Sequence, residues 1–142
     1  APVKGKPGVT SVVNPDYRQG KATSVKAALQ HIPASTQGIL VLAVDQPRPA
    51  NILEALVAAH LEGTALITCP VYRGHTGHPL IFTASLLPEM LAITEEGQGL
   101  REVTHRHSED THRMEVDSPI VTVDVNSPEQ FREAERLFEG VE

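Results

Sequence analysis

The sequence contains no tryptophan and only one cysteine, Cys69. One cysteine cannot form a disulfide within the chain, which excludes the class of small secreted domains held together by disulfides. Cys69 stands among apolar neighbours, and cysteines in such surroundings usually behave as small buried hydrophobic residues. We therefore predict a structural role for Cys69 and assign it no chemistry.

Long apolar runs are missing as well. A membrane helix needs roughly 18 consecutive apolar residues, and no segment approaches this length. The first residues, which include Lys4 and Lys6, contain no apolar core of a signal peptide. These absences predict a cytoplasmic protein without a membrane partner.

The chain also lacks an excess of positive charge. Its formal net charge is −6 and its pI is about 5.6, with acidic and basic residues mixed along the sequence. Nucleic-acid-binding surfaces are clusters of Lys and Arg, so no nucleic-acid partner is predicted. A glycine-rich phosphate loop of Walker or Rossmann spacing is absent from the sequence too.

The composition that remains is that of an ordinary globular protein. Of the 142 residues, 40% are hydrophobic and 21% are charged, which favours folding around a core over disorder. A chain of this length supports one hydrophobic core better than two. We expect a single domain over residues 1–142.

Short apolar segments alternate with segments of helical periodicity along the chain. The expected strands are 9–13, 38–44, 65–72, 79–82, 114–116 and 120–125. The expected helices are 22–32, 50–61, 86–93, a weaker one at 98–107, and a last one that begins at Pro128 behind the N-cap Ser127. This alternation predicts an α/β fold with a largely parallel sheet, in which segment 38–44 is covered on both faces.

Polar residues follow two of the expected strands. Asp45 ends the segment 38–44, and Asp124 and Asn126 end the segment 120–125. Ligands of such sheets bind outside the carboxyl ends of the strands, and Mg²⁺ prefers carboxylate oxygens there. An alternative with equal weight for Asp45 is that it caps a turn or the helix near Pro49, and for Asn126 ordinary capping of the last helix is favoured.

Two histidine-containing segments are candidate metal sites. The loop Gly74-His-Thr-Gly-His-Pro79 has glycines that allow a close approach to a ligand, and histidines at a spacing compatible with metal binding. His105, His107 and His112 lie in a strongly polar stretch. We expect all these histidines to be solvated surface residues, and a metal-binding scaffold is the function that the sequence supports least.

Five motifs together carry a family resemblance. They are Val12-Val-Asn-Pro-Asp-Tyr-Arg-Gln-Gly20 with Ser24, Val44-Asp-Gln-Pro47, Cys69-Pro-Val-Tyr72, Gly77-His-Pro79 and Val123-Asp-Val-Asn-Ser-Pro-Glu129. In this order they resemble the MobA-like nucleotidyltransferases, and most closely the molybdenum cofactor cytidylyltransferase branch. Each motif alone is weak, whereas the ordered set, which extends from Val9 onward, is fairly specific.

The resemblance implies a fold and a reaction. The fold is a Rossmann-like three-layer α/β fold of the nucleotide-diphospho-sugar transferase type, with a mostly parallel sheet. The reaction is Mg²⁺-dependent transfer of a nucleotidyl group, CMP from CTP being favoured, to a phosphorylated acceptor such as molybdopterin, with release of pyrophosphate. The implied partners are therefore a nucleoside triphosphate and a phosphorylated small molecule.

The resemblance also assigns roles to single residues. It makes Asp45 the catalytic, Mg²⁺-coordinating aspartate, with Asp124 and Asn126 as further metal-facing residues; Asn126-Ser127 replaces the usual Asp-Thr. It places Asn14, Gly20 and Ser24 along the nucleotide base. It places Gly77, His78 and Pro79 in the loop on the acceptor side.

One part of the family pattern is absent from the sequence. The family opens with a strand and the motif LAAGxSxRMGxxK, which holds the triphosphate, and residue 1 here corresponds to a point just before the third strand. From the resemblance we expect the C-terminal portion of a nucleotidyltransferase domain, a fragment or a chain completed by another chain. The exposed sheet edge that would result also favours a homodimer. The alternative function is a non-catalytic nucleotide- or cofactor-binding module that lacks the triphosphate loop.

Overall fold

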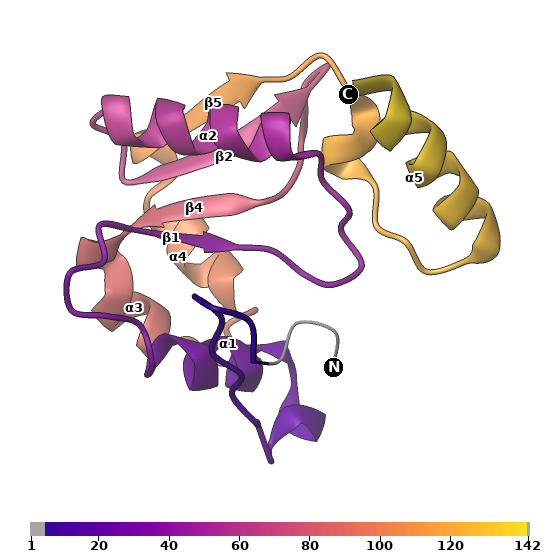
Figure 1. Ribbon diagram of the computed structural model, residues 1–142. Helices are drawn as coiled ribbons and strands as arrows, with labels where there is room; N and C mark the ends of the chain where they lie inside the picture. The colour runs from indigo at the N-terminus through magenta and orange to yellow at the C-terminus, as the bar shows by residue number, and fades with distance from the viewer. Residues whose placement is uncertain (1–4, 142) are drawn as a thin grey trace. The chain divides into compact units, whose positions relative to one another are not determined.

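The computed structural model describes residues 5–141 (Figure 1). It divides into two compact units, which are described separately. The first contains the chain up to Thr36 and the segment Leu87–Arg106, and the second contains Gln37–Leu86 and the chain from His107 onward. The single domain expected over residues 1–142 stays a prediction.

The second unit combines a sheet with helices. Its elements are β1 (Gly38–Val41), α2 (Ala50–Glu62), β2 (Ile67–Tyr72), β3 (His75–Thr76), β4 (Leu80–Thr83), η2 (Ala84–Leu86), η3 (Ser108–Asp110), β5 (Thr111–Glu115), η4 (Pro119–Thr122) and α5 (Pro128–Val141), where η is a 3₁₀ helix. The first unit contains η1 (Tyr17–Gln19), α1 (Lys21–Leu29), α3 (Leu87–Leu91) and α4 (Leu100–Arg106). The α/β class predicted from the sequence is confirmed.

The sheet has five strands in the order β1-β4-β2-β3, and β5 pairs with β2. β4 is antiparallel to β1 and to β2, and β5 is parallel to β2. β1, β2 and β5 therefore run in one direction, with β4 inserted against them, so the sheet is mixed. α2 lies over β2 in Figure 1 and contacts β2, β4 and β5.

Strand β2 changes its partner half-way along its length. Ile67 and Thr68 pair with β4, whereas Val71 and Tyr72 pair with β3. Proline has no N–H to donate to a ladder, and Pro70 lies at this change of partner. Its carbonyl accepts a hydrogen bond from the N–H of Gly77 at 2.8 Å, which holds the loop before β4 against β2.

Two segments expected to be strands are not strands. Val9–Val13 forms no ladder with any described residue, and Val13 is 87% exposed. A β-branched run becomes a strand only where a neighbouring strand takes its backbone hydrogen bonds. In segment 120–125, residues up to Thr122 belong to η4, where the hydroxyl of Ser118 accepts a hydrogen bond from the N–H of Ile120 at 3.3 Å.

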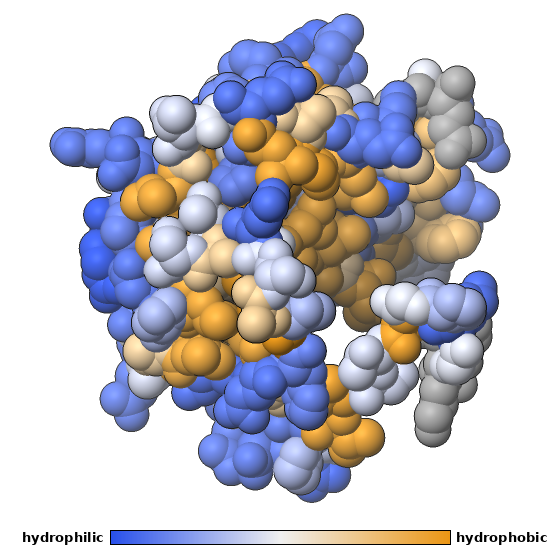
Figure 2. All heavy atoms as spheres, turned by 60° about the vertical axis from the view of Figure 1, so that its left-hand side comes forward, coloured by the Kyte–Doolittle hydropathy of each residue, from blue (hydrophilic) through white to orange (hydrophobic). Residues whose placement is uncertain are grey.

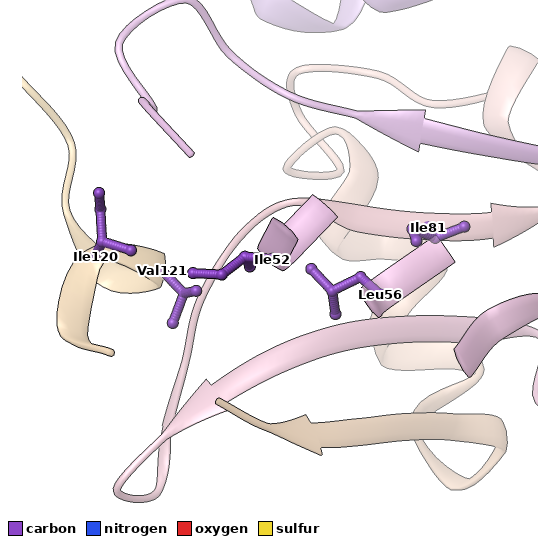
Figure 3. Packing of buried hydrophobic residues seen from close by; sticks show 5 residues of the cluster. All are labelled: Ile52, Leu56, Ile81, Ile120 and Val121. Atoms are coloured by element: carbon purple, nitrogen blue, oxygen red, sulfur yellow. The ribbon is translucent and has the colours of Figure 1, made fainter. Parts of the chain in front are cut away.

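The apolar residues of η4 belong to the hydrophobic core and not to a strand. Ile120 and Val121 are fully buried and join Ile52 and Leu56 of α2 and Ile81 of β4 in one hydrophobic cluster (Figure 3). Figure 3 shows these side chains on the helix, the sheet and η4. The backbone of η4 is thereby fixed to the core of the second unit.

β1 is less covered than its sequence predicted. It ends at Val41, and within residues 5–141 it pairs only with β4. Leu40 and Leu42 are 36% and 38% exposed, and Val44 is fully exposed, so the apolar run 38–44 is not buried on both faces. Hydrophobic residues also reach the surface among hydrophilic ones on the face shown in Figure 2.

A histidine is buried between α2 and the sheet. His60 is 7% exposed, its Nδ1 lies 2.7 Å from the Thr68 hydroxyl, and its Nε2 lies 3.2 Å from the Thr83 hydroxyl. Burial lowers the pKa of His60, and the positive charge of His112 acts in the same direction. Cys69 on β2 is buried as well, which raises the pKa of its thiol and agrees with its predicted structural role.

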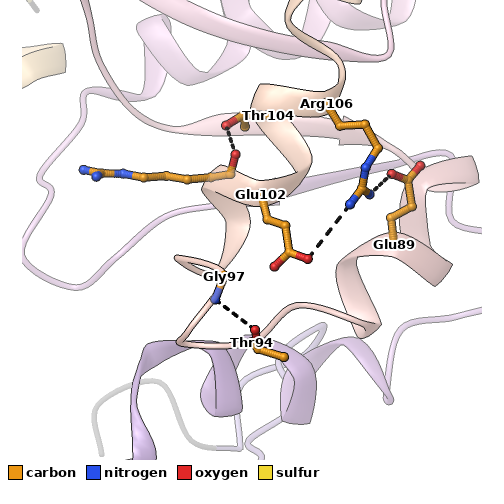
Figure 4. A network of polar contacts seen from close by, with 7 residues as sticks. Glu89, Thr94, Gly97, Glu102, Thr104 and Arg106 are labelled. Atoms are coloured by element: carbon orange, nitrogen blue, oxygen red, sulfur yellow. Dashed lines mark hydrogen bonds and ion pairs between the residues drawn. The ribbon is translucent and has the colours of Figure 1, made fainter.

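The first unit is held by polar contacts as well as by its small apolar core. Arg106 of α4 forms ion pairs with Glu89 of α3 and, at 3.9 Å, with Glu102 one turn earlier (Figure 4). The N–H of Gly97 donates to the Thr94 hydroxyl at 3.0 Å and closes the turn before α4. None of the helices in residues 5–141 is long and apolar enough to cross a membrane.

Candidate functional site

Asp45 lies in the turn that follows β1, four residues after its last residue, Val41. Its side chain is half-buried, and its carboxylate makes no hydrogen bond or ion pair to any residue between 5 and 141. The helix that follows has Pro49 at its N-cap and no side-chain cap. Asp45 therefore does not cap α2, and its carboxylate is available to a ligand.

Gln46, the next residue, connects Asp45 to Asp124. Its Oε1 accepts a hydrogen bond from the N–H of Ala43 at 3.0 Å, which fixes the turn. Its Nε2 donates to Oδ1 of Asp124 at 3.2 Å. In addition, the N–H of Val125 donates to the carbonyl of Asp45 at 2.7 Å. The two aspartate-bearing segments, far apart in the sequence, are thus directly joined.

Arg48 lies beneath this junction and is only 6% exposed. Its Nε donates to the carbonyl of His78 at 2.8 Å. Its Nη1 donates to the carbonyls of Pro47 and Val123 at 2.9 Å, and its Nη2 donates to that of Val121 at 3.0 Å. Four N–H···O=C bonds of a buried cation thereby tie three chain segments together.

The charge of Arg48 also acts on the site. Burial lowers the pKa of Arg48, and the negative charges of Asp124 and Asp45 oppose that effect. A guanidinium stays protonated at any physiological pH, so a permanent positive charge faces the two carboxylates from within the protein.

The loop Gly77–Pro79 is bound by hydrogen bonds to η4 and to Arg48. The N–H of His78 donates to the carbonyl of Val121 at 2.8 Å, while its carbonyl accepts from Arg48. Pro79 is buried behind a cis peptide bond, and the His78 side chain is exposed. A Cβ at Gly77 would collide with the Val121 carbonyl, so this glycine is required by close packing. Only the His78 side chain faces outward.

Asn126 is exposed and belongs to the start of α5. The hydroxyl of Ser127 accepts a hydrogen bond from the N–H of Gln130 at 3.2 Å, and Oε1 of Gln130 accepts from the N–H of Asn126 at 2.7 Å. Ser127 and Gln130 thus form the predicted capping arrangement, except that Gln130 accepts from the N–H of Asn126 and not from that of Ser127. Within residues 5–141 the Asn126 side chain forms no hydrogen bond to Asp45 or Asp124.

The residues expected along the nucleotide base lie in the first unit. Nδ2 of Asn14 donates to the hydroxyls of Thr23 and Ser24, both at 2.9 Å, so Asn14 and Ser24 are brought together at the start of α1. Gly20, the residue before α1, has φ +122°, a conformation that favours glycine. Behind it the carboxylate of Glu95 accepts a hydrogen bond from the N–H of Ala22 at 2.5 Å.

The donor set of Asp45 and Asp124 fits a hard divalent cation. Mg²⁺ is usually held by one or two carboxylates, with phosphate and water oxygens completing its shell. Asp45 has both carboxylate oxygens available, and in the described contacts Asp124 uses only Oδ1. By contrast, no group of three or more His, Cys, Asp or Glu residues between 5 and 141 could hold a metal ion by itself.

Comparison with known proteins identifies the family. The family model of the MobA-like NTP transferase domain matches residues 2–111. The chain belongs to this family. The match ends before Asp124, but a curated relative extends further: the molybdenum cofactor cytidylyltransferase of Escherichia coli K12 is 25% identical over 134 residues, 92% of this chain. The chain spans 64% of that relative's length.

Solved structures of the same fold agree with this assignment. Rv0371c of Mycobacterium tuberculosis H37Rv aligns with a TM-score of 0.65 and 25% identity over 83% of this chain and 59% of its own. Its homologue from Mycobacterium sp. strain JC1 aligns with a TM-score of 0.64 and 23% identity over 84% of this chain and 59% of its own. A complex of Rv0371c with manganese aligns with a TM-score of 0.63.

Sequence reasoning missed three residues that hold the candidate residues in place, two in the second unit and one in the first. Arg48 and Gln46 carry the internal hydrogen bonds of the candidate metal site, and Glu95 caps α1 from a distant segment. The sequence does contain a signal for Arg48. It stands between Pro47 and Pro49, just after Asp45-Gln46, which is an unusual place for a solvated charge. No sequence signal pointed to Glu95, whose partner lies 73 positions away.

Proposed function

We propose that this protein takes part in metal-dependent transfer of a nucleotidyl group from a nucleoside triphosphate to a phosphorylated acceptor, with pyrophosphate as the other product. The observation that carries the proposal is the junction of Asp45 and Asp124 through Gln46 and the Val125 N–H. Membership of the MobA-like NTP transferase family supports it. Because the chain spans less than two thirds of its curated relative, the activity of the whole protein is part of this proposal.

The nucleotide and the acceptor are inferred from the relative. CTP is the favoured donor and a molybdopterin-type cofactor the favoured acceptor, because the relative from Escherichia coli is a molybdenum cofactor cytidylyltransferase. An oxygen of the acceptor phosphate forms a bond to the α-phosphorus, the bond from that phosphorus to the bridging oxygen of the β-phosphate breaks, and its electron pair leaves with pyrophosphate. No net oxidation occurs.

The proposed roles of the residues are supported by the contacts within each unit and by the family motifs. Asp45 and Asp124 would hold Mg²⁺, for which the manganese complex of Rv0371c is a supporting parallel. When bound, such an ion supplies positive charge that offsets the charge developing on the phosphate oxygens. The exposed side chain of His78 and the backbone of Gly77–Pro79 would face the acceptor, and Asn14, Gly20 and Ser24 would face the base.

The activity is tested by pyrophosphate release from the protein as its source produces it. CTP, GTP, ATP and UTP are each supplied with Mg²⁺ and a molybdopterin-type acceptor, and Asp45→Asn is the matched variant. We expect release with CTP and a loss of at least about 100-fold in Asp45→Asn, since one partner of a positioned charge is removed. Nucleotide binding without release would instead identify a binding module.

We also propose that the open edge of β1 is paired with a further strand, from a second copy or from a completing chain. Among residues 5–141, β1 pairs on one side only, and the backbone groups of its other side, beside an exposed Leu40, favour such pairing. The test is the mass in solution by light scattering. A dimer that becomes a monomer in Leu40→Lys, but not in the control Phe131→Lys on α5, would support a homodimer. A wild-type monomer would refute it.

A further inference from the structure

Arg48 contacts the backbone on both sides of the candidate metal site. Of the carbonyls it binds, that of Pro47 lies two residues after Asp45, and that of Val123 immediately precedes Asp124. The third segment is the loop that contains His78, whose carbonyl accepts from Nε. A single side chain thus fixes the backbone next to each carboxylate and next to the loop on the acceptor side.

The guanidinium itself does not reach into the site. It is buried, with only 6% of the residue exposed, and it donates four hydrogen bonds to main-chain carbonyls. One of these carbonyls belongs to Val121, which is part of the hydrophobic core (Figure 3). Arg48 therefore links the backbone of Val121 by hydrogen bonds to the segments that carry Asp45 and Asp124.

We propose that Arg48 is a positioning residue, which sets the spacing of Asp45 and Asp124 for one divalent cation and couples that site to the Gly77–Pro79 loop. The inference rests on the proposed function, because it takes the two aspartates as metal ligands. Residues behind metal ligands typically change metal affinity by about 10–100-fold when replaced. Arg48 is such a residue: it holds the segments that carry the ligands and does not contact the cation itself.

Two effects of Arg48 have opposite signs, which allows them to be separated. Its positive charge by itself disfavours a cation nearby, so removal of the charge alone would strengthen cation binding. Its hydrogen bonds hold the carboxylates in place, so their loss weakens binding. Arg48→Lys keeps the charge but cannot reproduce the planar fork of donors, and Arg48→Gln removes the charge as well.

The experiment is a titration with Mn²⁺ alone, followed by electron paramagnetic resonance of the free ion. It compares the wild type with both Arg48 variants, at a temperature where circular dichroism shows each to be folded. We expect at least about 10-fold weaker binding in Arg48→Lys and Arg48→Gln. Unchanged binding in Arg48→Lys together with tighter binding in Arg48→Gln would overturn the proposal, because only charge would then matter.

A matched control distinguishes the positioning role of Arg48 from a purely structural role. Leu56 is fully buried in the same unit and contacts neither carboxylate segment through a hydrogen bond, and Leu56→Ala costs about 2–5 kcal/mol of stability. We expect Leu56→Ala to keep the Mn²⁺ affinity of the wild type while it is folded. Equal weakening in Leu56→Ala and Arg48→Lys would overturn the positioning role.

The wild type provides a second test that does not depend on how well the variants fold. Addition of Mg²⁺ is expected to slow hydrogen–deuterium exchange at residues 43–47 and 122–126 and also at the N–H groups of Gly77 and His78. Slowing confined to the two aspartate segments would overturn the coupling. The variant Asp45→Asn separates this proposal from the proposed function. If Asp45→Asn binds Mn²⁺ like the wild type, the metal site of the proposed function is wrong. If Asp45→Asn loses Mn²⁺ binding while Arg48→Lys binds Mn²⁺ like the wild type, only the role of Arg48 is refuted.

Discussion

Gln46 donates a hydrogen bond from its Nε2 to Oδ1 of Asp124, 78 positions further along the chain, at 3.2 Å. This contact orients one carboxylate of the candidate metal site and leaves its second oxygen outside the described hydrogen bonds. The amide is chemically suited to this place, because it is neutral and offers both a donor and an acceptor. A carboxylate in the same place would add charge to a site that already holds two aspartates.

Replacement of Gln46 by Glu is therefore expected to destabilise the protein at neutral pH by about 1 kcal/mol, since a donor becomes a like charge beside Asp124. If Asp45 and Asp124 bind a divalent cation, 10 mM Mg²⁺, on the order of a saturating concentration for a site of this kind, should reverse part of that loss. Thermal unfolding with and without Mg²⁺ measures both effects. Gln130→Glu on α5 is the control: its metal site is unchanged, so Mg²⁺ should stabilise it only as much as it stabilises the wild type. A Mg²⁺-independent melting temperature in Gln46→Glu would contradict the metal site.

Gly77→Ala is expected to destabilise the second unit by about 1–3 kcal/mol, because the added methyl group meets the Val121 carbonyl and either the loop or η4 must move. Denaturant unfolding measures the difference in the free energy of unfolding. Gly140→Ala on α5 is the control: a Cβ at residue 140 meets nothing within 4 Å, and alanine favours a helix by up to about 1 kcal/mol. Similar values for the two variants would show that the close approach at Gly77 is not tight.

The buried His60 predicts a dependence of stability on pH. Its pKa is lowered in the folded state, so on acidification the unfolded chain takes up a proton at this position first, at a pH near the ordinary histidine value of about 6.5. Stability should therefore fall as the pH drops below that value, and the fall should end once the pH passes below the folded-state pKa. Urea unfolding at pH 7.5, 6.5, 5.5 and 4.5 checks the sign.

A variant isolates the contribution of His60 from those of the other histidines. His60→Gln keeps a side chain that can bond to Thr68 or Thr83 but cannot titrate. Its stability should change less than that of the wild type between pH 7.5 and pH 4.5. Parallel curves for the two proteins would mean that His60 has the same pKa in the folded and unfolded states.

Asn14→Ala tests the nucleotide side in the first unit. It removes both hydrogen bonds to Thr23 and Ser24, which shape the start of α1, and should weaken the binding of Mg·CTP by about 10-fold, equivalent to about 1.4 kcal/mol. Isothermal titration calorimetry measures the dissociation constant. Thr104→Ala, which removes only a bond to the Arg101 carbonyl in the same unit, should bind like the wild type. An unchanged dissociation constant in Asn14→Ala would remove Asn14 from the nucleotide site.

Much of the fold could be predicted from local patterns. The helices at 50–62 and 128–141 and the strand at 67–72 follow from hydrophobic periodicity, from Pro128 at a first helical position and from the cap that Ser127 provides. The family followed from five motifs in order, each too short to specify anything alone. These features depend on residues close in the sequence, which is why the sequence by itself determined them.

Tertiary structure decided the remainder. Val9–Val13 and Ile120–Val125 have the composition of strands, but only the strands available for pairing and the space in the core decide whether such a run joins a sheet or packs as η4. Likewise, the sequence marked Asp45 and Asp124 by their places after apolar runs, whereas their junction through Gln46 and Arg48 depends on segments about 75 residues apart. Long-range hydrogen bonds of buried polar groups leave no periodic trace in a sequence, so only the folded chain reveals them.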